Sequence, residues 1–346
     1  MPPLTHADLL AVPPTRRDTI QRLAREFVRG RRVALSTHVN SDGDGCGSES
    51  ALARLLTGLG LEPCIVNPTP WPHLFRFLLG GDVVDKSADG ARALKHADLL
   101  IVLDINDVGR LGPLAETVRH LSVPRLVIDH HIAGPEPTAG TVFSDTTACA
   151  TGELIYDLAQ VLGLPITPAI ATSLYVAMLT DTGGFRFSNT SPRCHAIAGA
   201  LLAAGVEPES IYQRIYQSVP AGRLRLLRDA LDSLEHDPEI GLAWISVKAG
   251  AMERYGVVAD DLDGIVEHPR SIVGTRMALF FRDLGHNRVK ISFRSTGTVD
   301  ANQLARQFGG GGHAKASGAL VEGSLADVKQ RVVEAARTFL RSTSLT

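Results

Sequence analysis

The sequence predicts an α/β protein of two domains, the first built on a parallel sheet and the second, smaller one on a mixed sheet. The chain has 346 residues, which is comfortable for two domains, and 44% of them are apolar. In the first half, short apolar runs alternate with helical segments, as in parallel strands joined by right-handed crossovers. From residue 192 onward helices follow one another and a hairpin pattern appears, which indicates a different domain.

The first half contains four runs that we expect to be buried strands, at 32–37, 63–66, 98–103 and 125–128. Apolar residues at helical spacing predict helices before and between them, at 15–29, 48–58, 73–79 and 88–96. Two further helices are expected at 151–163 and 167–179. This order of elements favours a parallel sheet.

The second half begins with helical segments at 196–205, 211–219 and 221–234. Strands are expected at 242–247, 275–281 and 288–295, and a closing helix at 325–340. Asp283, Gly285 and Asn287 separate the last two strands, which predicts a hairpin. We therefore expect a first domain over 1–195, a helical connector over 196–222 and a second domain over 223–346.

Charge and cysteine usage narrow the class of protein. The net charge of -2 gives no signal for long duplex DNA or an anionic membrane, so a nucleic-acid partner should be short. The four cysteines form no C-x-x-C pair, which disfavours a zinc knuckle or a disulfide scaffold and fits a reducing cytosol. The longest apolar stretch, 196–206, is too short to span a bilayer. A soluble, cytoplasmic protein without a membrane partner is expected.

Carboxylate and imidazole side chains follow the predicted strands and one predicted helix. They are His38, Asp42 and Asp44 after the first strand, Asp104 after the third, Asp129, His130 and His131 after the fourth, and Asp181 after the helix at 167–179. A single aspartate in such a place is usually a turn residue or a helix cap. Because ligands bind at the carboxyl ends of parallel strands, we expect these four segments to meet at one edge.

Carboxylates and imidazoles packed together would repel and be costly to desolvate unless cations lay among them. Oxygen and nitrogen ligands without thiolate favour hard-to-borderline divalent ions, and Mn²⁺ is the expected one. Two such ions roughly 3.5–4 Å apart can activate a water and clamp the oxygens of a phosphoryl group. The sequence therefore predicts a centre with two divalent metal ions that cleaves phosphate esters.

Three glycines surround the first acidic pair. They are expected either to form an irregular turn that aims both carboxylates inward or to be an ordinary glycine-rich turn. Ser48 is then expected to cap the helix that follows, whose N-terminal amides would favour an anion. The glycines are Gly43, Gly45 and Gly47.

The ordered segments His38-x-x-x-Asp42-x-Asp44, Asp104, Asp129-His130-His131 and Asp181 resemble the motifs of the DHH phosphoesterase superfamily. This superfamily contains oligoribonucleases that also act on 3'-phosphoadenosine 5'-phosphate (pAp), RecJ exonucleases, family II inorganic pyrophosphatases and cyclic-di-AMP phosphodiesterases. Arg294-Ser295 and the glycine-rich segment 308–318 resemble the substrate motifs of the DHHA1 domain, which the pyrophosphatases lack. The resemblance covers the whole chain and implies a DHH domain followed by a DHHA1 domain.

The resemblance implies a role for each matching residue. One metal would be held by His38, Asp42 and Asp104, and the other by Asp44, Asp104, His130 and Asp181, so that Asp104 is shared. The implied catalytic residues are Asp104, His131 as a polariser or acid, and Asp129, which would orient His130. The implied substrate-binding residues are Asn40, Arg110, Arg294, Ser295, Gly310, Gly311, Gly312 and His313.

The glycine run 309–312 has two interpretations, a flexible linker or a segment whose bare backbone receives a phosphate or a base. The second fits an enzyme that hydrolyses short oligoribonucleotides to mononucleotides and pAp to AMP. Short single-stranded RNA or DNA and nucleotides are the expected partners, and a homodimer is one expected assembly. Two alternatives stay open: a phosphodiesterase for linear or cyclic dinucleotides (pApA, pGpG, cyclic-di-AMP), and a nucleotide-binding regulator without turnover.

Overall fold

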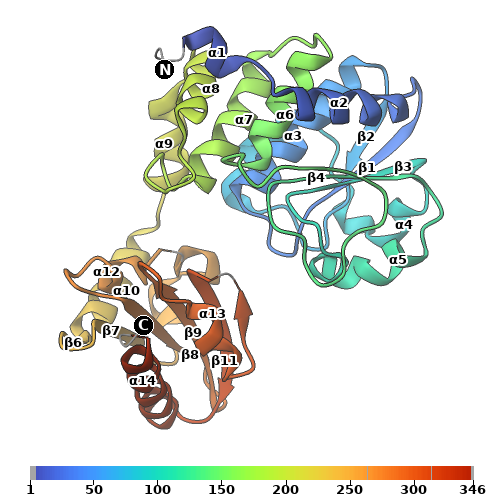
Figure 1. The fold of residues 1–346 in the computed structure, drawn as a ribbon. Coiled ribbons are helices and arrows are strands. Elements are labelled where there is room, and N and C mark those ends of the chain that lie inside the picture. The colour runs from blue at the N-terminus through green and yellow to red at the C-terminus, as the bar shows by residue number, and fades with distance from the viewer. Residues whose placement is uncertain (1–4, 263, 313, 344–346) are drawn as a thin grey trace. The chain divides into compact units, whose positions relative to one another are not determined.

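A computed structural model describes residues 5–262, 264–312 and 314–343. The chain divides between Gln217 and Ser218 into two compact units, and the division falls inside the expected connector. Each unit is an α/β structure with its own sheet (Figure 1). No helix among the described residues has the length and apolar character needed to cross a membrane.

The first unit contains a five-stranded sheet in which all strand pairs are parallel, as predicted. Its strands are β1 (Arg32–Ser36), β2 (Glu62–Ile65), β3 (Leu99–Leu103), β4 (Arg125–Asp129) and β5 (Thr141–Ser144), in the order β2-β1-β3-β4-β5. The four expected strands are present. The edge strand β5 was missed because, of its four residues, only Phe143 is buried, and this leaves no apolar run to recognise.

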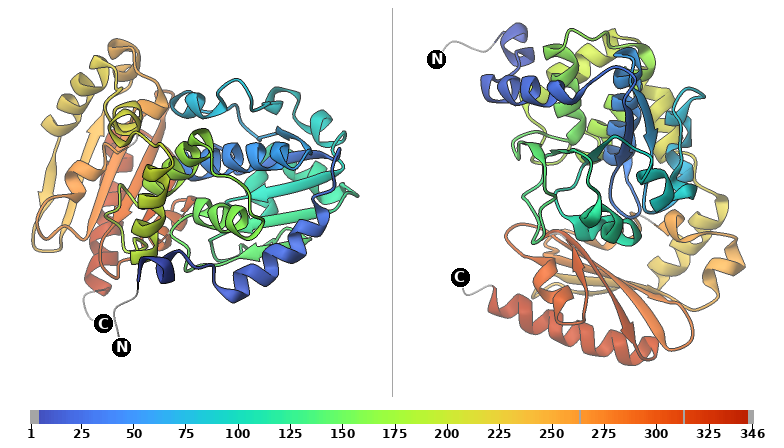
Figure 2. Two further views of the ribbon diagram at one scale, coloured as in Figure 1. Left: turned by 90° about the horizontal axis from the view of Figure 1, so that it is seen from above. Right: turned by 90° about the vertical axis from the view of Figure 1, so that its right-hand side faces the viewer.

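Helices cover both faces of this sheet (Figure 2). They are α1 (His6–Leu10), α2 (Pro14–Leu23), α3 (Gly43–Gly58), α4 (Ala91–Leu94), α5 (Ala115–His120), α6 (Thr151–Val161), α7 (Pro168–Asp181), α8 (Pro192–Ala203) and α9 (Pro208–Tyr216), with 3₁₀ turns η1 (Ala24–Glu26), η2 (His73–Leu79), η3 (Ser87–Asp89) and η4 (Val108–Leu114). One core joins the sheet to α3, α6 and α7, and the other joins it to α4 and α5. The expected helix at 15–29 already ends at Leu23, and the one at 73–79 is a 3₁₀ turn.

The glycine-rich segment after β1 is helical, and here the sequence-based expectation is wrong. Helix α3 begins at Gly43, with Asp42 as its N-cap, whose side chain accepts from the backbone N–H groups of Asp44 and Gly45. Ser48 therefore lies inside the helix and does not cap it. An aspartate N-cap supplies the acceptor that the first helical amides need, so the helix can begin five residues earlier than expected.

These glycines are required by packing rather than by a turn. A Cβ atom at Gly43 would collide with the side chain of Thr180, and one at Gly47 would collide with the backbone carbonyl of Ser173. Both partners belong to α7, so the glycines let α3 and α7 approach closely. The close approach brings the start of α3 to the end of α7, where Asp181 lies.

The second unit contains a mixed sheet, as predicted, and the described residues give it six strands where three were expected. Its strands are β6 (Glu235–Asp237), β7 (Leu242–Val247), β8 (Met277–Asp283), β9 (Arg288–Ser295), β10 (Gly311–Gly312) and β11 (Ala316–Glu322), in the order β10-β11-β9-β8-β7-β6. Only β7 and β8 pair in parallel, and β8 and β9 form the predicted hairpin.

The helices of this unit lie on both faces of its sheet. They are α10 (Ala221–Asp232), α11 (Ala251–Tyr255), α12 (Glu267–Arg270), α13 (Ala301–Arg306) and α14 (Leu325–Ser342), with the 3₁₀ turn η5 (Ala259–Leu262). Helices α13 and α14 pack on one face, where α14 runs along the sheet (Figure 2), and α10 to α12 pack on the other. The closing helix was predicted within two residues of its observed end.

Candidate metal centre

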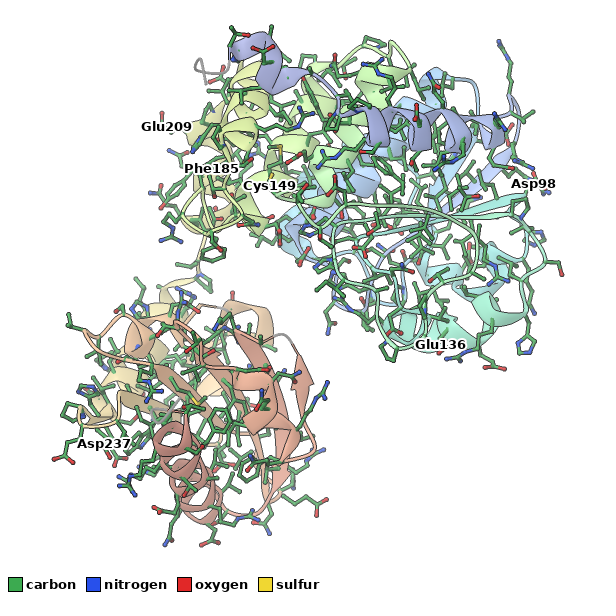
Figure 3. All side chains as sticks on the ribbon, viewed as in Figure 1. Asp98, Glu136, Cys149, Phe185, Glu209 and Asp237 are labelled. Atoms are coloured by element: carbon green, nitrogen blue, oxygen red, sulfur yellow. The ribbon has the colours of Figure 1, made fainter. Side chains whose placement is uncertain are left out.

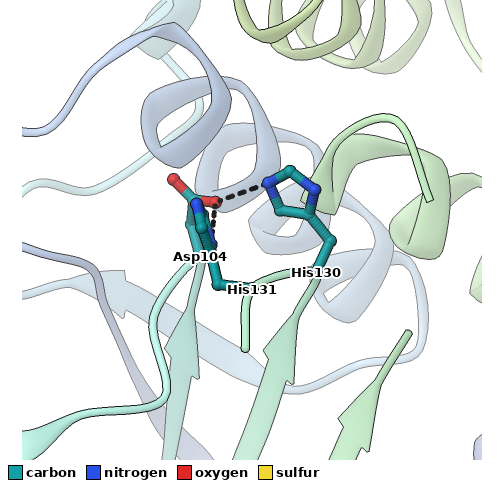
Figure 4. Close-up of side chains that lie close together, drawn as sticks. All are labelled: Asp104, His130 and His131. Atoms are coloured by element: carbon teal, nitrogen blue, oxygen red, sulfur yellow. Dashed lines mark ion pairs between the residues drawn. The ribbon is translucent and has the colours of Figure 1, made fainter. Parts of the chain in front are cut away.

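The predicted metal ligands converge at the carboxyl edge of the first sheet. His38 follows β1, Asp104 follows β3, and His130 follows β4, so parallel strands deliver all three to one edge. Figure 4 shows Asp104 and His130 there. The other ligands come from helices. Asp42 and Asp44 lie at the start of α3, and Asp181 lies at the end of α7.

Asp104 lies between two groups of side chains that could each hold a metal ion. In the first group, the Nε2 atom of His38 is 3.5 Å from Asp104 Oδ2 and 3.8 Å from Asp42 Oδ2. In the second, the Nε2 atom of His130 is 3.6 Å from Asp44 Oδ2, 3.5 Å from Asp181 Oδ2 and 3.7 Å from Asp104 Oδ1. The two oxygens of Asp104 thus face different groups.

The surroundings of His130 fit a metal ion. Its Nε2 atom is buried and has no hydrogen-bond partner among the described residues, and the three nearest carboxylate oxygens are too distant for hydrogen bonds. Its Nδ1 atom lies 3.2 Å from the carbonyl oxygen of Ala148, which can only accept. The proton is therefore assigned to Nδ1, which leaves the Nε2 lone pair directed at the carboxylates.

Charge and burial push several ligands toward their protonated forms. Burial and the neighbouring charge of Asp44 raise the pKa of Asp104 well above its ordinary value, and burial raises that of Asp181 to about 8. Burial alone would lower the pKa of His38, but the facing carboxylates of Asp104 and Asp42 raise it to about 10. These groups therefore retain protons unless a cation replaces them.

Asp129 pairs with His131, whereas the resemblance had implied that it orients His130. The Oδ1 atom of Asp129 lies 2.8 Å from His131 Nδ1 and accepts from the His131 backbone N–H at 3.1 Å. Asp129 is fully buried, while the side chain of His131 is 28% exposed. Figure 4 shows both imidazoles beside Asp104. His131 is thus held at the centre with one ring nitrogen committed to Asp129.

The backbone at Asp104 is unusual. Its φ angle is +62°, in the left-handed region that non-glycine residues seldom adopt. The Asp104 N–H donates to the carbonyl of Ile128 on β4 at 3.0 Å, which holds the residue in place. Asn40, two residues after His38, also has a positive φ, +55°. Such local strain is typical of functional sites.

The start of α6 supports the ligands, and sequence reasoning missed this. Backbone N–H groups of Thr151 and Gly152 donate to Asp44 at 2.6 and 3.0 Å, and Ser48 donates its hydroxyl to the same carboxylate at 3.0 Å. The Thr151 hydroxyl donates to Asp104 Oδ1 at 3.0 Å. The available signal was the predicted helix start at 151, because the first amides of a helix are unpaired and attract anions.

A buried ionic network lies behind this helix start. Arg16, 4% exposed, contacts Asp145 at 2.6 Å, Glu153 at 2.6 Å and Asp157 at 2.8 Å. Arg193 of α8 contacts the same Glu153 and Asp157. Two carboxylates of α6 are therefore shared between guanidinium groups of α2 and α8, which fixes the helix against its neighbours.

Two predicted substrate residues of the first unit lie in loops beside the ligands. The N–H of Asn40 donates to the hydroxyl of Thr69 at 2.8 Å, which leaves the asparagine side chain exposed. The carbonyl of Arg110 accepts from the N–H of Val39 at 3.0 Å, so the Arg110 loop is tied next to His38.

Four of the predicted substrate residues of the second unit lie on strands, namely Arg294 and Ser295 on β9 and Gly311 and Gly312 on β10, and Gly310 directly precedes β10. Arg294 lies with its Nε atom 3.4 Å from Glu267 Oε1, and its side chain is 30% exposed. Ser295 is buried, and its hydroxyl donates to the carbonyl of Val299 at 2.8 Å. His313 lies outside the described residues.

The last two glycines of the run belong to a strand rather than to a linker. Gly311 and Gly312 form β10, which pairs with β11. A Cβ atom at Gly310 would collide with the backbone of Gly318, and Gly312 has a φ of +143°. Gly311 has neither constraint, because its φ is not positive and a Cβ there would meet nothing within 4 Å. The fold of the unit therefore does not explain why residue 311 is a glycine.

Comparisons with known proteins agree with the motifs. The family model "DHH family, N-terminal domain" matches residues 32–178, and the model "DHHA1 domain" matches residues 245–342. A Thermus thermophilus protein named bifunctional oligoribonuclease and PAP phosphatase NrnA is 34% identical over 317 residues, which cover 89% of this chain and 90% of that protein. The Bacillus subtilis protein of the same name is 30% identical over 295 residues, covering 84% of this chain and 89% of that one.

A solved structure supports the fold of the whole chain. The crystal structure of an exopolyphosphatase-related protein from Bacteroides fragilis superposes with a TM-score of 0.86 at 26% identity. The match covers 94% of this chain and 96% of that one. The similarity therefore extends through both units.

Proposed function

The chain belongs to the DHH/DHHA1 phosphoesterase family, and we propose that it hydrolyses short oligoribonucleotides to mononucleotides, and pAp to AMP, at a centre of two divalent metal ions. One observation carries this proposal: Asp104 lies between two sets of ligand atoms, one with His38 and one with His130. The name shared by the Thermus and Bacillus relatives supports the substrate class.

We assign the ligands as the family resemblance implies, and the distances around His38 and His130 support this assignment. His38, Asp42 and Asp104 would hold one ion, and Asp44, Asp104, His130 and Asp181 would hold the other. Bound there, two divalent cations would lower the pKa of a water and offset the charge of the phosphoryl oxygens. Oxygen and imidazole ligands without thiolate support Mn²⁺ as the ion.

His131 is the group best placed to move a proton. Asp129 accepts from its Nδ1 atom at 2.8 Å, so Nδ1 carries the proton of the neutral ring. Asp129 is fully buried and also accepts the His131 backbone N–H, so the ring cannot turn freely. We assign His131 to polarise a phosphoryl oxygen or to protonate the leaving oxygen.

The second unit carries further residues that we assign to substrate recognition. Exposed backbone at Gly311 can approach a phosphate or a base more closely than any residue with a side chain. Arg294 would pair with a phosphate. The other assigned substrate residues are Asn40, Arg110, Ser295, Gly310, Gly312 and His313. A net charge of -2 fits short substrates, since long RNA calls for a basic track.

A cytoplasmic location fits the cysteines. Cys46, Cys64, Cys149 and Cys194 are all free thiols, and three of them are buried. We expect the enzyme in a reducing compartment. A homodimer stays a prediction that measurement of the mass in solution will check.

The direct test incubates purified protein and Mn²⁺ with 5'-labelled di- to pentaribonucleotides and with pAp. We expect mononucleotides and AMP, and no product with a chelator present. Including pApA, pGpG and cyclic-di-AMP distinguishes the dinucleotide alternative by relative turnover. Intact oligoribonucleotides and intact pAp after incubation would refute the proposal, and tight binding without turnover would favour the regulator.

A further inference from the structure

The segment after α7 leaves the metal centre and returns to it. Asp181 ends the helix, and Asn189 comes back beside it, with its amide 3.3 Å from Asp181 Oδ2 and 3.2 Å from the Asp181 carbonyl. The same amide donates to the carbonyl of Cys149 at 2.9 Å. Both ends of the segment are therefore anchored at a proposed metal ligand, and residues between them cannot lie far from it.

Two phenylalanines in this segment have different environments. Phe185 is packed, with its ring centroid 5.8 Å from that of Tyr175 and 5.4 Å from that of His195 (Figure 3). Phe187 is 47% exposed, although its backbone N–H is fixed by the carbonyl of Thr182 at 3.0 Å. A large apolar ring is thus held at the surface by an ordered backbone.

The Phe187 ring rests on bare backbone. A Cβ atom at Gly183 would collide with three atoms of this ring, and Gly183 has a φ of +58°. The carbonyl of Gly183 accepts from Arg186 Nε at 2.6 Å, which further fixes the turn. The ring therefore lies against a residue only two positions beyond Asp181, and about half of Phe187 stays exposed.

We propose that Phe187 is a stacking platform for the base of the nucleotide whose phosphate lies at the metal centre. This inference rests on the proposed function, because it assumes that a nucleotide phosphate binds beside Asp181. A base lies one sugar away from its phosphate, and the ring lies within one short turn of the ligand. Every base has a flat π face, so stacking on an aromatic ring binds bases with little sequence preference.

A protein partner fits this ring less well than a base. A stable protein interface buries on the order of 1,000 Å² or more, whereas this feature is a single ring in a tight turn. Proteins that bind single-stranded nucleic acid use exposed aromatic rings as surfaces on which bases stack. The experiment below separates stacking on a base from a purely structural role of the ring.

The test compares Phe187→Leu with Phe187→Trp, and Tyr212→Leu serves as a matched control because Tyr212 is equally exposed, at 49%, on α9. The substrates are a diribonucleotide and the same compound with one base removed. We expect Phe187→Leu to raise KM for the intact dinucleotide roughly 5- to 100-fold, with little change for the abasic one. Phe187→Trp should retain the wild-type KM, and Tyr212→Leu should match wild type on both substrates.

A binding measurement complements the kinetics. The Phe187→Trp ring should lose fluorescence when the intact dinucleotide binds, and the abasic compound should leave it unchanged. An equal rise in KM for both substrates would assign the ring to packing and would overturn the inference. An unchanged KM in Phe187→Leu would overturn it as well. If wild type cleaves neither compound, the proposed function fails instead.

Discussion

The metal centre and the glycine segment of β10 are built in opposite ways. At the metal centre six side chains are gathered from two helices and three strand ends, and each carboxylate or imidazole is fixed by neighbours. At β10 the side chains are absent, and what remains is exposed backbone. The metal centre should lose its function when a side-chain group is removed. The β10 segment should lose its function when a side-chain group is added.

The largest loss of activity is expected from a substitution of Asp104 at the metal centre. Asp104→Ala should lower turnover by at least about 10³-fold, because it removes the carboxylate that faces both groups of ligands. Steady-state hydrolysis of a diribonucleotide measures the loss. The control is Asp98→Ala, because Asp98 is an exposed partner of Arg32 (Figure 3) and should not affect activity. Unchanged activity in Asp104→Ala would exclude Asp104 as the shared ligand.

A second test asks whether metal binding also depends on the residues that hydrogen-bond to the metal ligands. Thr151→Val keeps the shape of the side chain and removes the hydroxyl that donates to Asp104 Oδ1. We expect metal affinity to fall roughly 10- to 100-fold, as for other residues that orient a ligand. Calorimetric titration of metal-free protein with Mn²⁺ measures it. Thr151→Ser should restore the affinity, and equal affinities in all three proteins would show that the hydroxyl is dispensable.

Substitutions at two neighbouring glycines, Gly310 and Gly311, test the role of the exposed backbone at β10. Gly310→Ala should lower the free energy of unfolding by about 1–3 kcal/mol, because its Cβ would collide with the backbone of Gly318. Gly311→Ala should leave stability near wild type and raise KM, because only a ligand would meet its Cβ. Thermal unfolding and steady-state kinetics separate the two effects. A wild-type KM in Gly311→Ala would remove this backbone from the substrate site.

The final test follows the pH dependence that the metal centre gives to stability. Asp181 has its pKa raised from 3.8 to about 8, and His38 has its pKa raised from 6.5 to about 10. The folded state therefore binds more protons than the unfolded chain across this range, and stability of metal-free protein should fall as pH rises from about 4 to 10.

Mn²⁺ should change how stability depends on pH, because the bound metal requires deprotonated ligands. Apparent Mn²⁺ affinity should increase between pH 6 and pH 8.5, in the direction set by Asp181. Thermal melts with and without Mn²⁺ at several pH values provide the measurement. Parallel curves in the two series would contradict this assignment of protons, and the β10 variants should show the wild-type pH dependence.

The parallel sheet and the convergence of ligands could be predicted because both follow from local patterns. A fully apolar run such as β3 indicates a buried strand, and strand direction then places Asp104 at the shared edge. The start of α3 could not be predicted, because three glycines indicate a turn unless the neighbouring helix is known. Gly43 and Gly47 are explained only by Thr180 and Ser173, which are far away in the sequence.

The residues that hydrogen-bond to the metal ligands and to His131 could not be predicted, for a related reason. Thr151 contacts Asp44 and Asp104 through one hydroxyl and one amide, and neither group is distinctive in a sequence. The pairing of Asp129 with His131 likewise depends on side-chain direction, which the motif does not specify. The motifs therefore identified the carboxylates and imidazoles of the centre. The structure was needed to identify the groups that hydrogen-bond to them.

The ionic network behind α6 should affect how the protein behaves when it is heated. Arg16 is nearly fully buried among carboxylates, and desolvating such charges is a cost that shrinks as temperature rises. Apolar packing gains no comparable advantage at high temperature. The helix start that supports Asp44 and Asp104 therefore rests on contacts whose relative value grows on warming. Near the melting temperature, the framework of the metal centre should be among the last parts of the first unit to loosen.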